Sequence, residues 1–267
     1  MKISRKKVKS IITKSNLPET DYVINPYIGC QHACIYCYAD FMKRFTSHQN
    51  DIWGNFVDIK TNAPETIKRI KPHSTLLIGS VTDPYQPIET TEKITRKCLK
   101  QLIPLQPKLE ILTKSPLILR DIDLLKQFKN LRVGISIGIL NESYARQLEP
   151  CAPSPKSRID TIKKLHDAGI RTCLFMSPIF PKISKITPLL DQITNIVEEV
   201  WFENLNIRAN NQRNIFNFLQ DNRPDLIPTY KSLSSNPTHW KKIRTEIITE
   251  CNKRRLKYRL FFNHNAR

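Results

Sequence analysis

The chain has 267 residues, of which 40% are hydrophobic, and it carries a formal charge of +19. This length suits one large α/β domain, and no apolar run approaches the roughly 18 residues that a membrane span needs. The basic start of the chain lacks the apolar stretch of a secretory signal, so we expect a cytoplasmic protein whose seven cysteines remain reduced.

The positive charge is concentrated at the two ends of the chain. Residues 1–14 hold six basic and no acidic residues, and residues 238–267 hold nine basic and two acidic residues. The ends therefore carry +6 and +7, which is +13 of the total +19. Such ends favour a polyanionic partner, namely nucleic acid. The alternative is a lysine-rich, solvated surface that has no partner.

The chain opens with a basic arm over residues 1–19, for which we predict little regular structure, and continues with a strand at Tyr22–Ile28 and a helix at Ile35–Arg44. Strands and helices then alternate. We predict further strands at Phe56–Lys60, Thr75–Gly79, Leu109–Thr113, Leu131–Ile137, Arg171–Met176 and Val200–Asn204. The helices predicted between them are Pro64–Ile70, Thr91–Ile103, Leu117–Phe128, Pro155–Ala168 and Leu189–Val197. The remainder of the chain is predicted to be mostly helical and to end in a strand at Tyr258–Phe262.

This alternation implies βα units and a parallel sheet. Right-handed crossovers would curl the sheet toward a barrel, so that the loops after the strands meet at one mouth. We expect residues 20–206 to form this core and residues 207–267 to form a basic, helical C-terminal extension packed on it.

A helix at Pro237–Lys253 would place apolar residues at helical spacing on one face, which should pack on the barrel. These residues are Trp240, Ile243, Ile247 and Cys251. Basic residues would then point elsewhere, close to the arm at Lys6, Lys7 and Lys9, and form a strip that contacts a nucleic-acid backbone. They are Lys241, Lys242, Arg244 and Arg254, with Arg255 and Lys257 beside them.

The segment 25–39 contains Cys30, Cys34 and Cys37 in a C-x3-C-x2-C spacing. Three thiolates can hold three irons of a four-iron, four-sulfur cluster and leave the fourth iron open to a ligand that is not protein. We expect a loop, bent at Gly29, that runs into a helix on which Cys34 and Cys37 share a face. The alternatives are zinc, with His32 as the nearest fourth ligand, and three unrelated thiols.

Short polar side chains follow later strands and would lie at the same mouth. Ser80, Thr82 and Asp83 follow the strand that ends at Gly79, and they could bind an amine or simply shape a turn. Lys114 follows the next strand and could pair with a carboxylate, while Ser136 lies in the strand after that.

A series of motifs resembles the spore photoproduct lyase-like branch of the radical S-adenosylmethionine (SAM) superfamily, often labelled "DNA repair photolyase". The similarity covers about residues 20–206. The motifs are Asn25-Pro-Tyr-x-Gly-Cys30 with Cys34-x-Tyr-Cys-Tyr38, Thr82-Asp-Pro-Tyr-Gln-Pro87, Thr113-Lys-Ser115, Arg120-Asp-x-Asp-x-Leu125, Leu148-Glu-Pro150 and Pro178-Ile-x-Pro181.

The resemblance implies a partial (β/α)6 barrel and a [4Fe-4S] cluster on the three cysteines, with SAM bound to the open iron. It implies that Tyr36 lies against the adenine, that Ser80, Thr82 and Asp83 meet the SAM amino group, that Lys114 meets its carboxylate and that Ser136 meets the ribose. It also implies an electron donor such as flavodoxin or ferredoxin, reductive cleavage of SAM, and hydrogen abstraction from nucleic acid in a lyase-like lesion repair.

One departure concerns the return of hydrogen to the product. The branch's characterised lyase uses a cysteine near the loop that corresponds to residues 79–83, and this chain has none there. Cys98 falls inside a predicted helix and is a poor substitute. Radical modification of a peptide or small molecule therefore remains an alternative, as does a non-catalytic iron–sulfur or zinc protein that binds nucleic acid.

Overall fold

The central element of the computed structural model is an eight-stranded sheet. The structure describes residues 1–233, 235 and 238–262. The strand order of the sheet is β11-β10-β9-β8-β7-β6-β3-β2, and every pairing is parallel except that of β2 with β3. The strands are β2 (Ile12–Lys14), β3 (Tyr22–Ile24), β6 (Thr75–Ile78), β7 (Lys108–Thr113), β8 (Leu131–Ser136), β9 (Thr172–Ile179), β10 (Glu199–Asn204) and β11 (Lys257–Phe261).

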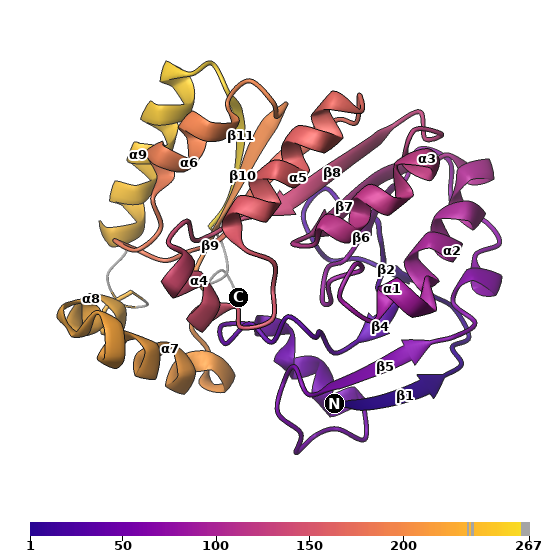
Figure 1. Ribbon diagram of the computed structural model, residues 1–267, viewed down its shortest axis with the longest axis horizontal. Coiled ribbons are helices and arrows are strands. Elements are labelled where there is room, and N and C mark those ends of the chain that lie inside the picture. Colours follow the sequence, from indigo (N-terminus) through magenta and orange to yellow (C-terminus); the bar gives the residue numbers. More distant parts are fainter. Residues whose placement is uncertain (234, 236–237, 263–267) are drawn as a thin grey trace.

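This sheet confirms the predicted α/β fold and the partial (β/α)6 barrel. Six parallel strands, β3 and β6 to β10, form its core, and β11 adds a seventh beside β10. Figure 1 shows α5 (Pro155–Asp167), α6 (Ile186–Ile193) and α9 (Thr238–Lys253) on one side of the sheet. The remaining helices are α1 (Glu89–Glu92), α2 (Ile94–Leu102), α3 (Ile122–Leu125), α4 (Glu142–Leu148), α7 (Ala209–Asn222) and α8 (Ile227–Lys231).

Successive side chains of a strand face opposite sides of the sheet. Val133 of β8 and Phe202 of β10 are fully buried in the main hydrophobic cluster. Their neighbours Arg132 and Trp201 lie on the other face, where the Arg132 guanidinium is 5.7 Å from the Trp201 ring centroid. Arg259 of β11 stacks on the same ring and pairs with Glu19, so the last strand approaches the chain just before β3.

The prediction of a loosely ordered arm over residues 1–19 is wrong. Residues 2–6 form β1 (Lys2–Lys6), which pairs in parallel with β5 (Phe56–Lys60) in a second sheet of order β1-β5-β4, and β2 lies in the same arm. The predicted strand at Tyr22–Ile28 is divided between the sheets as β3 and β4 (Tyr27–Ile28). Pro26 separates the two strands, because it has no N–H to donate to a sheet.

Several predicted helices are shorter than expected. In place of the helix predicted at Ile35–Arg44 the structure has a 3₁₀ helix at Tyr38–Phe45, and the segment Pro64–Ile70 contains a single 3₁₀ turn, Pro64–Thr66. Lys93 has a positive φ of 55° and divides the next predicted helix into α1 and α2. The helix predicted at residues 117–128 is a 3₁₀ helix over residues 116–121 followed by α3, and α4 was not predicted.

The face predicted for the last helix is confirmed, although Pro237 lies outside the described residues. Ile247 and Cys251 are fully buried, and Trp240 and Ile243 pack against the core. Three exposed residues, which we name the α9 cations, point away from the core: they are Lys241, Lys242 and Arg244. Among the described residues no helix combines the length and apolar character needed to span a bilayer.

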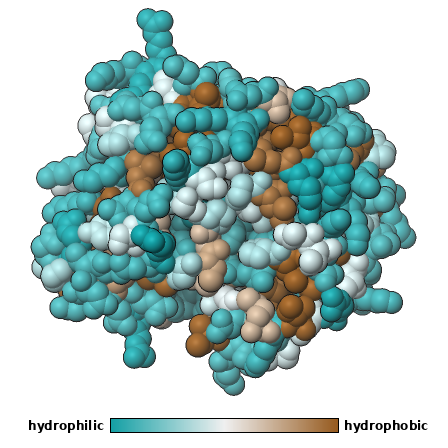
Figure 2. All heavy atoms as spheres, in the orientation of Figure 1, coloured by the Kyte–Doolittle hydropathy of each residue, from teal (hydrophilic) through white to brown (hydrophobic). Residues whose placement is uncertain are grey.

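The expected closeness of the C-terminal basic strip to the N-terminal arm is wrong, and so is the exposed role of Arg254, while contact of the strip with nucleic acid stays a prediction. Arg254 pairs with Asp191 and Glu250, and the arm cations Lys2, Arg5 and Lys6 also have carboxylate partners. Figure 1 shows β1 and α9 on opposite sides of the molecule, so the described parts of the two basic ends lie apart. Figure 2 shows hydrophilic residues over most of the visible face, with hydrophobic residues in separate patches.

Candidate cofactor site

Cys30, Cys34 and Cys37 lie in an irregular loop between β4 and the 3₁₀ helix at 38–45. Ala33 has a left-handed φ of 54°, and its N–H donates to the Cys30 carbonyl oxygen at 3.2 Å. Gly29 has a φ of 90°, and a Cβ there would lie 2.4 Å from the Phe56 carbonyl oxygen. The expected bend at Gly29 is confirmed, whereas the predicted helical face shared by Cys34 and Cys37 is wrong.

The three cysteine thiols of this loop are donors of the kind that an iron–sulfur cluster takes. All three cysteines are free. Burial raises the pKa of Cys34 to about 11 against the opposing positive charge of Lys114 and Arg158, and burial and the Cys34 charge raise the pKa of Cys37 to about 12. Both are thiols at neutral pH, so binding a metal group must displace their protons.

The alternative of a single zinc ion would need several donors gathered around one point. In the described part of the chain, no three His, Cys, Asp or Glu side chains are gathered in this way. His32, the fourth ligand in that alternative, directs its Nδ1 to Asp83 at 3.3 Å. A four-iron cluster instead spreads its ligands over separate irons, so three thiolates can each hold one iron and leave the fourth open.

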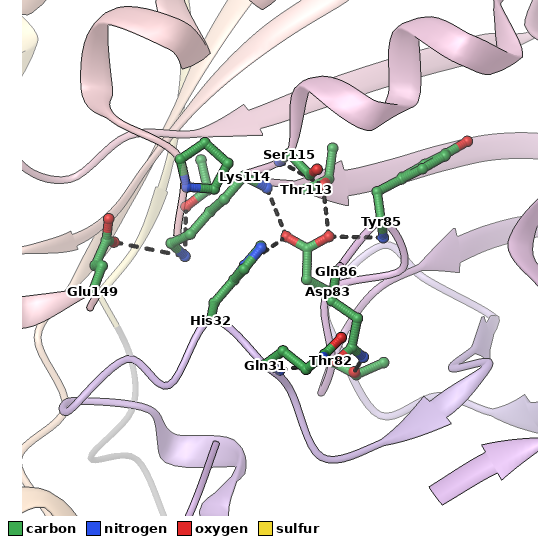
Figure 3. A network of polar contacts seen from close by, with 12 residues as sticks. Gln31, His32, Thr82, Asp83, Tyr85, Gln86, Thr113, Lys114, Ser115 and Glu149 are labelled. Carbon is green, nitrogen blue, oxygen red and sulfur yellow. Dashed lines mark hydrogen bonds and ion pairs between the residues drawn. The ribbon is translucent and has the colours of Figure 1, made fainter. Parts of the chain in front are cut away.

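The Asp83 carboxylate connects three segments at the mouth of the sheet, as Figure 3 shows. Its Oδ1 accepts from Thr113 Oγ1 at 2.6 Å and from the Tyr85 N–H at 2.9 Å, and its Oδ2 accepts from the Lys114 N–H at 2.7 Å. Burial opposes its ionisation, but the charge of His32 and these hydrogen bonds lower the Asp83 pKa to about 2. Asp83 therefore holds the loops in place, and its predicted contact with the SAM amino group stays a prediction.

The other two polar residues of that loop attach it to the cysteine loop. The Thr82 hydroxyl donates to the Gly29 carbonyl oxygen at 2.6 Å. Ser80 Oγ accepts from the side chain of Asn25 at 2.9 Å, and its carbonyl oxygen accepts from the Tyr38 hydroxyl at 2.5 Å. Ser80 is half-buried whereas Thr82 is buried, so Ser80 has the more accessible hydroxyl of the two.

Tyr36, Lys114 and Ser136 come from distant parts of the chain and meet in the structure. Lys114 Nζ lies 3.3 Å from Ser136 Oγ and 5.9 Å from the centre of the Tyr36 ring. Tyr36 packs edge to face on Phe180, with the ring centres 5.4 Å apart. The structure thus brings together the three residues predicted for the carboxylate, ribose and adenine of SAM, while these individual roles stay predictions.

Two buried residues of this group, Glu149 and Arg158, were not predicted as site residues. Glu149 accepts from the Tyr36 hydroxyl and from Arg158, and Lys114 Nζ lies 3.9 Å away (Figure 3). Arg158 also donates to the Ser136 carbonyl oxygen at 3.1 Å. The motif Leu148-Glu-Pro150 contributed only to the resemblance, and Glu149 directly follows α4, which was not predicted.

The charges in this group do not cancel. Burial opposes ionisation of Glu149, but the charges of Arg158 and Lys114 and the hydrogen bonds from Arg158 and Tyr36 lower its pKa. Lys114, Arg158 and His32 therefore face the two carboxylates of Glu149 and Asp83, which leaves one surplus positive charge in this buried group beside Cys34. A surplus of buried charge is unfavourable, so this location suits an anionic ligand.

The next two strands add a serine and a carboxylate that the sequence did not single out. Ser136 Oγ donates to the Ser177 carbonyl oxygen at 3.2 Å, and the Ser177 hydroxyl contacts Glu203. Burial and the charge of Glu203 both raise the pKa of Tyr38, which places Glu203 near the cysteine loop. The mouth of the sheet is thus lined by polar groups from β8, β9 and β10.

Comparisons with known proteins agree with this arrangement. A family model described as the radical SAM superfamily matches residues 24–188. An uncharacterised protein of Methanocaldococcus jannaschii is 37% identical over 254 residues, which cover 95% of each chain. A structure of spore photoproduct lyase complexed with dinucleoside spore photoproduct is 14% identical, with a TM-score of 0.72 over 98% of this chain and 82% of that one. Streptococcus suis SuiB bound to S-adenosylmethionine is 12% identical, with a TM-score of 0.55 over 91% of this chain and 47% of that one.

Proposed function

Because the chain belongs to the radical SAM superfamily of enzymes, we propose that it uses a [4Fe-4S] cluster and SAM to abstract hydrogen from a nucleic acid. When bound, such a cluster supplies the electron that splits SAM into methionine and a 5′-deoxyadenosyl radical. Cys30, Cys34 and Cys37 would hold the cluster. The surplus positive charge beside Cys34 is the observation that carries this assignment, because an anionic cluster and a carboxylate are the ligands it would stabilise.

In this proposal, Lys114 binds the SAM carboxylate by a charge-assisted hydrogen bond. Its ammonium lies between Ser136 Oγ at 3.3 Å and Glu149 Oε1 at 3.9 Å, so its position is fixed before a ligand arrives. Arg158 holds Glu149 from the other side and thereby keeps the carboxylate ionised. Such preorganised charges need not rearrange when the ligand binds.

The choice of nucleic acid is supported by charge. The formal charge of +19 favours a polyanion, and the α9 cations are exposed. The spore photoproduct lyase structure contains a dinucleoside photoproduct, and its likeness in fold to this chain suggests a lesion-repair-like lyase reaction. A base within a duplex would have to leave the stack to reach the mouth of the sheet. An electron donor such as flavodoxin or ferredoxin completes the proposal.

The proposal is tested by SAM cleavage in anaerobically reconstituted protein. We expect single-stranded or damaged DNA to increase the rate of 5′-deoxyadenosine formation above the rate without substrate. The matched control is the Cys34→Ser variant, which should form no 5′-deoxyadenosine under either condition. Stimulation by peptides, with none by DNA or RNA, would refute the nucleic-acid proposal and favour peptide modification.

A further inference from the structure

We propose that the cavity at the end of β10 is a subsite for one nucleobase of the substrate, an inference that rests on the nucleic-acid function proposed above. The cavity has a volume of about 200 Å³ and is lined by the loop 204–207 and by side chains of α7, α8 and α9. Drug-sized ligands occupy pockets of roughly 300–1,000 Å³. The smaller volume here suits a single planar ring system rather than a whole nucleotide.

Three aromatic side chains from three helices line the cavity: Phe216 of α7, Tyr230 of α8 and Trp240 of α9. Tyr230 is buried, and its hydroxyl donates to the Pro181 carbonyl oxygen at 3.1 Å. Trp240 packs edge to face on Phe262, with ring centres 5.7 Å apart. Aromatic rings held in this way provide stacking surfaces, and proteins bind unpaired bases mainly by such stacking.

Amide groups supply hydrogen bonding in the same cavity. Asn204, Asn206 and Gln212 all contribute to its lining. Asn204 is only 7% exposed. Side-chain amides both donate and accept hydrogen bonds, so these groups can pair with the donors and acceptors on the edge of a base.

The cavity is connected to the proposed cofactor site by β10 itself. The pairing of β10 with β9 shifts register between Phe202 and Asn204, which is the mark of a bulge. Bulges redirect side chains next to functional sites. Glu203 contacts Ser177 at the mouth of the sheet, whereas the adjacent Asn204 lines the cavity. A base bound in the cavity would therefore lie beside Asn204, whose neighbour in the chain, Glu203, lies at the mouth of the sheet.

Two further features concern the wall of the cavity and its charge. Asn211 donates to the Tyr36 carbonyl oxygen at 2.9 Å and to that of Asn206 at 3.0 Å, which fixes the cavity wall to the cysteine loop. Lys231 is an exposed cation that also lines the cavity. A phosphate joined to the bound base through its sugar could reach it, since phosphates are the principal partners of lysine on nucleic acids.

The test is ligand-observed saturation-transfer NMR on the anaerobically reconstituted full chain, with thymidine, cytidine, adenosine and guanosine as separate probes. We expect at least one nucleoside to receive saturation at its base protons. Phe216→Leu and Trp240→Leu should each weaken its binding at least tenfold. Phe45→Leu, at an aromatic residue that is 62% exposed and does not line the cavity, should change it less than twofold. Lys231→Gln, an exposed substitution that leaves the fold intact, should abolish any preference for the 5′-monophosphate over the nucleoside.

The outcomes separate the subsite from the proposed function. If no nucleoside binds, or if Phe216→Leu and Trp240→Leu behave like Phe45→Leu in folded protein, the subsite is refuted even where DNA still stimulates SAM cleavage. If nucleosides bind and both variants lose binding while DNA and RNA never stimulate cleavage, the subsite stands and the nucleic-acid function fails.

Discussion

The buried pair of Arg158 and Glu149 gives the most quantitative prediction. The two side chains are each 1% exposed, so each charge depends on the other rather than on water. Arg158→Met removes the cation while keeping most of the side-chain volume. It leaves Glu149 with Lys114 Nζ at 3.9 Å and the Tyr36 hydroxyl as its remaining partners.

The expected cost follows from these contacts. Arg158 donates to the Pro153 carbonyl oxygen at 2.8 Å, to that of Ser136 at 3.1 Å, and to Glu149. Charged hydrogen bonds contribute about 1.5–3 kcal/mol each, but methionine avoids the cost of burying a cation. Breaking a buried ion pair typically destabilises a protein by about 3–5 kcal/mol. Because Lys114 still compensates Glu149 in part, we expect a loss near 3 kcal/mol.

Urea unfolding of the cluster-free chain, followed by circular dichroism, measures this loss. The double variant Arg158→Met/Glu149→Leu is the matched control, because it removes both charges and should recover most of the stability. A single variant that loses less than about 1 kcal/mol, or a double variant less stable than the single one, would show that the pair is not a coupled buried unit.

Four further predictions concern the ligands and the surface. Replacing any of the three loop cysteines with serine should abolish iron binding on reconstitution, while Cys98→Ala should keep it; iron analysis decides. Lys114→Met should weaken SAM binding by about 1.5–3 kcal/mol in equilibrium dialysis, and unchanged affinity would exclude a carboxylate contact. Replacing the α9 cations with glutamine should reduce the log–log salt slope of DNA binding by about 0.9 for each phosphate that the protein no longer neutralises, and an unchanged slope would exclude this surface. Burial lowers the pKa of Lys60 to about 8 from 10.5, so its charge costs stability at and below about pH 8. Between pH 8 and 10 the stability of the wild type should rise relative to Lys60→Met, and parallel pH profiles would contradict this.

The sequence predicted those elements whose pattern is local. The strand at Phe56–Lys60 and the helix at residues 155–168 were located to within one residue, because alternation, Pro155 and Gly169 are local signals. The cysteine spacing likewise identified the central loop. Its conformation could not be predicted, since it depends on left-handed Ala33 and on the approach of Gly29 to Phe56 from another segment.

Features that depend on distant partners were missed. β1 is a strand because it pairs with the edge of β5, which is about fifty residues away in the chain. The basic sequence of β1 itself does not predict a strand. Glu149 and Arg158 were missed as site residues because their importance comes from the charge of Lys114 and from their burial. The sequence placed Lys114 just after one predicted strand and Ser136 within the next, and parallel pairing of β7 with β8 explains why they meet.

The proposed abstraction of hydrogen from a nucleic acid is tested most directly by mass spectrometry of 5′-deoxyadenosine formed by reconstituted protein, SAM and DNA deuterated at its sugar and base carbons. We predict that 5′-deoxyadenosine gains deuterium with DNA as substrate, and that it gains none with the Cys34→Ser variant or with unlabelled DNA. Turnover in the presence of deuterated DNA and deuterated RNA that yields only unlabelled 5′-deoxyadenosine would contradict the claim.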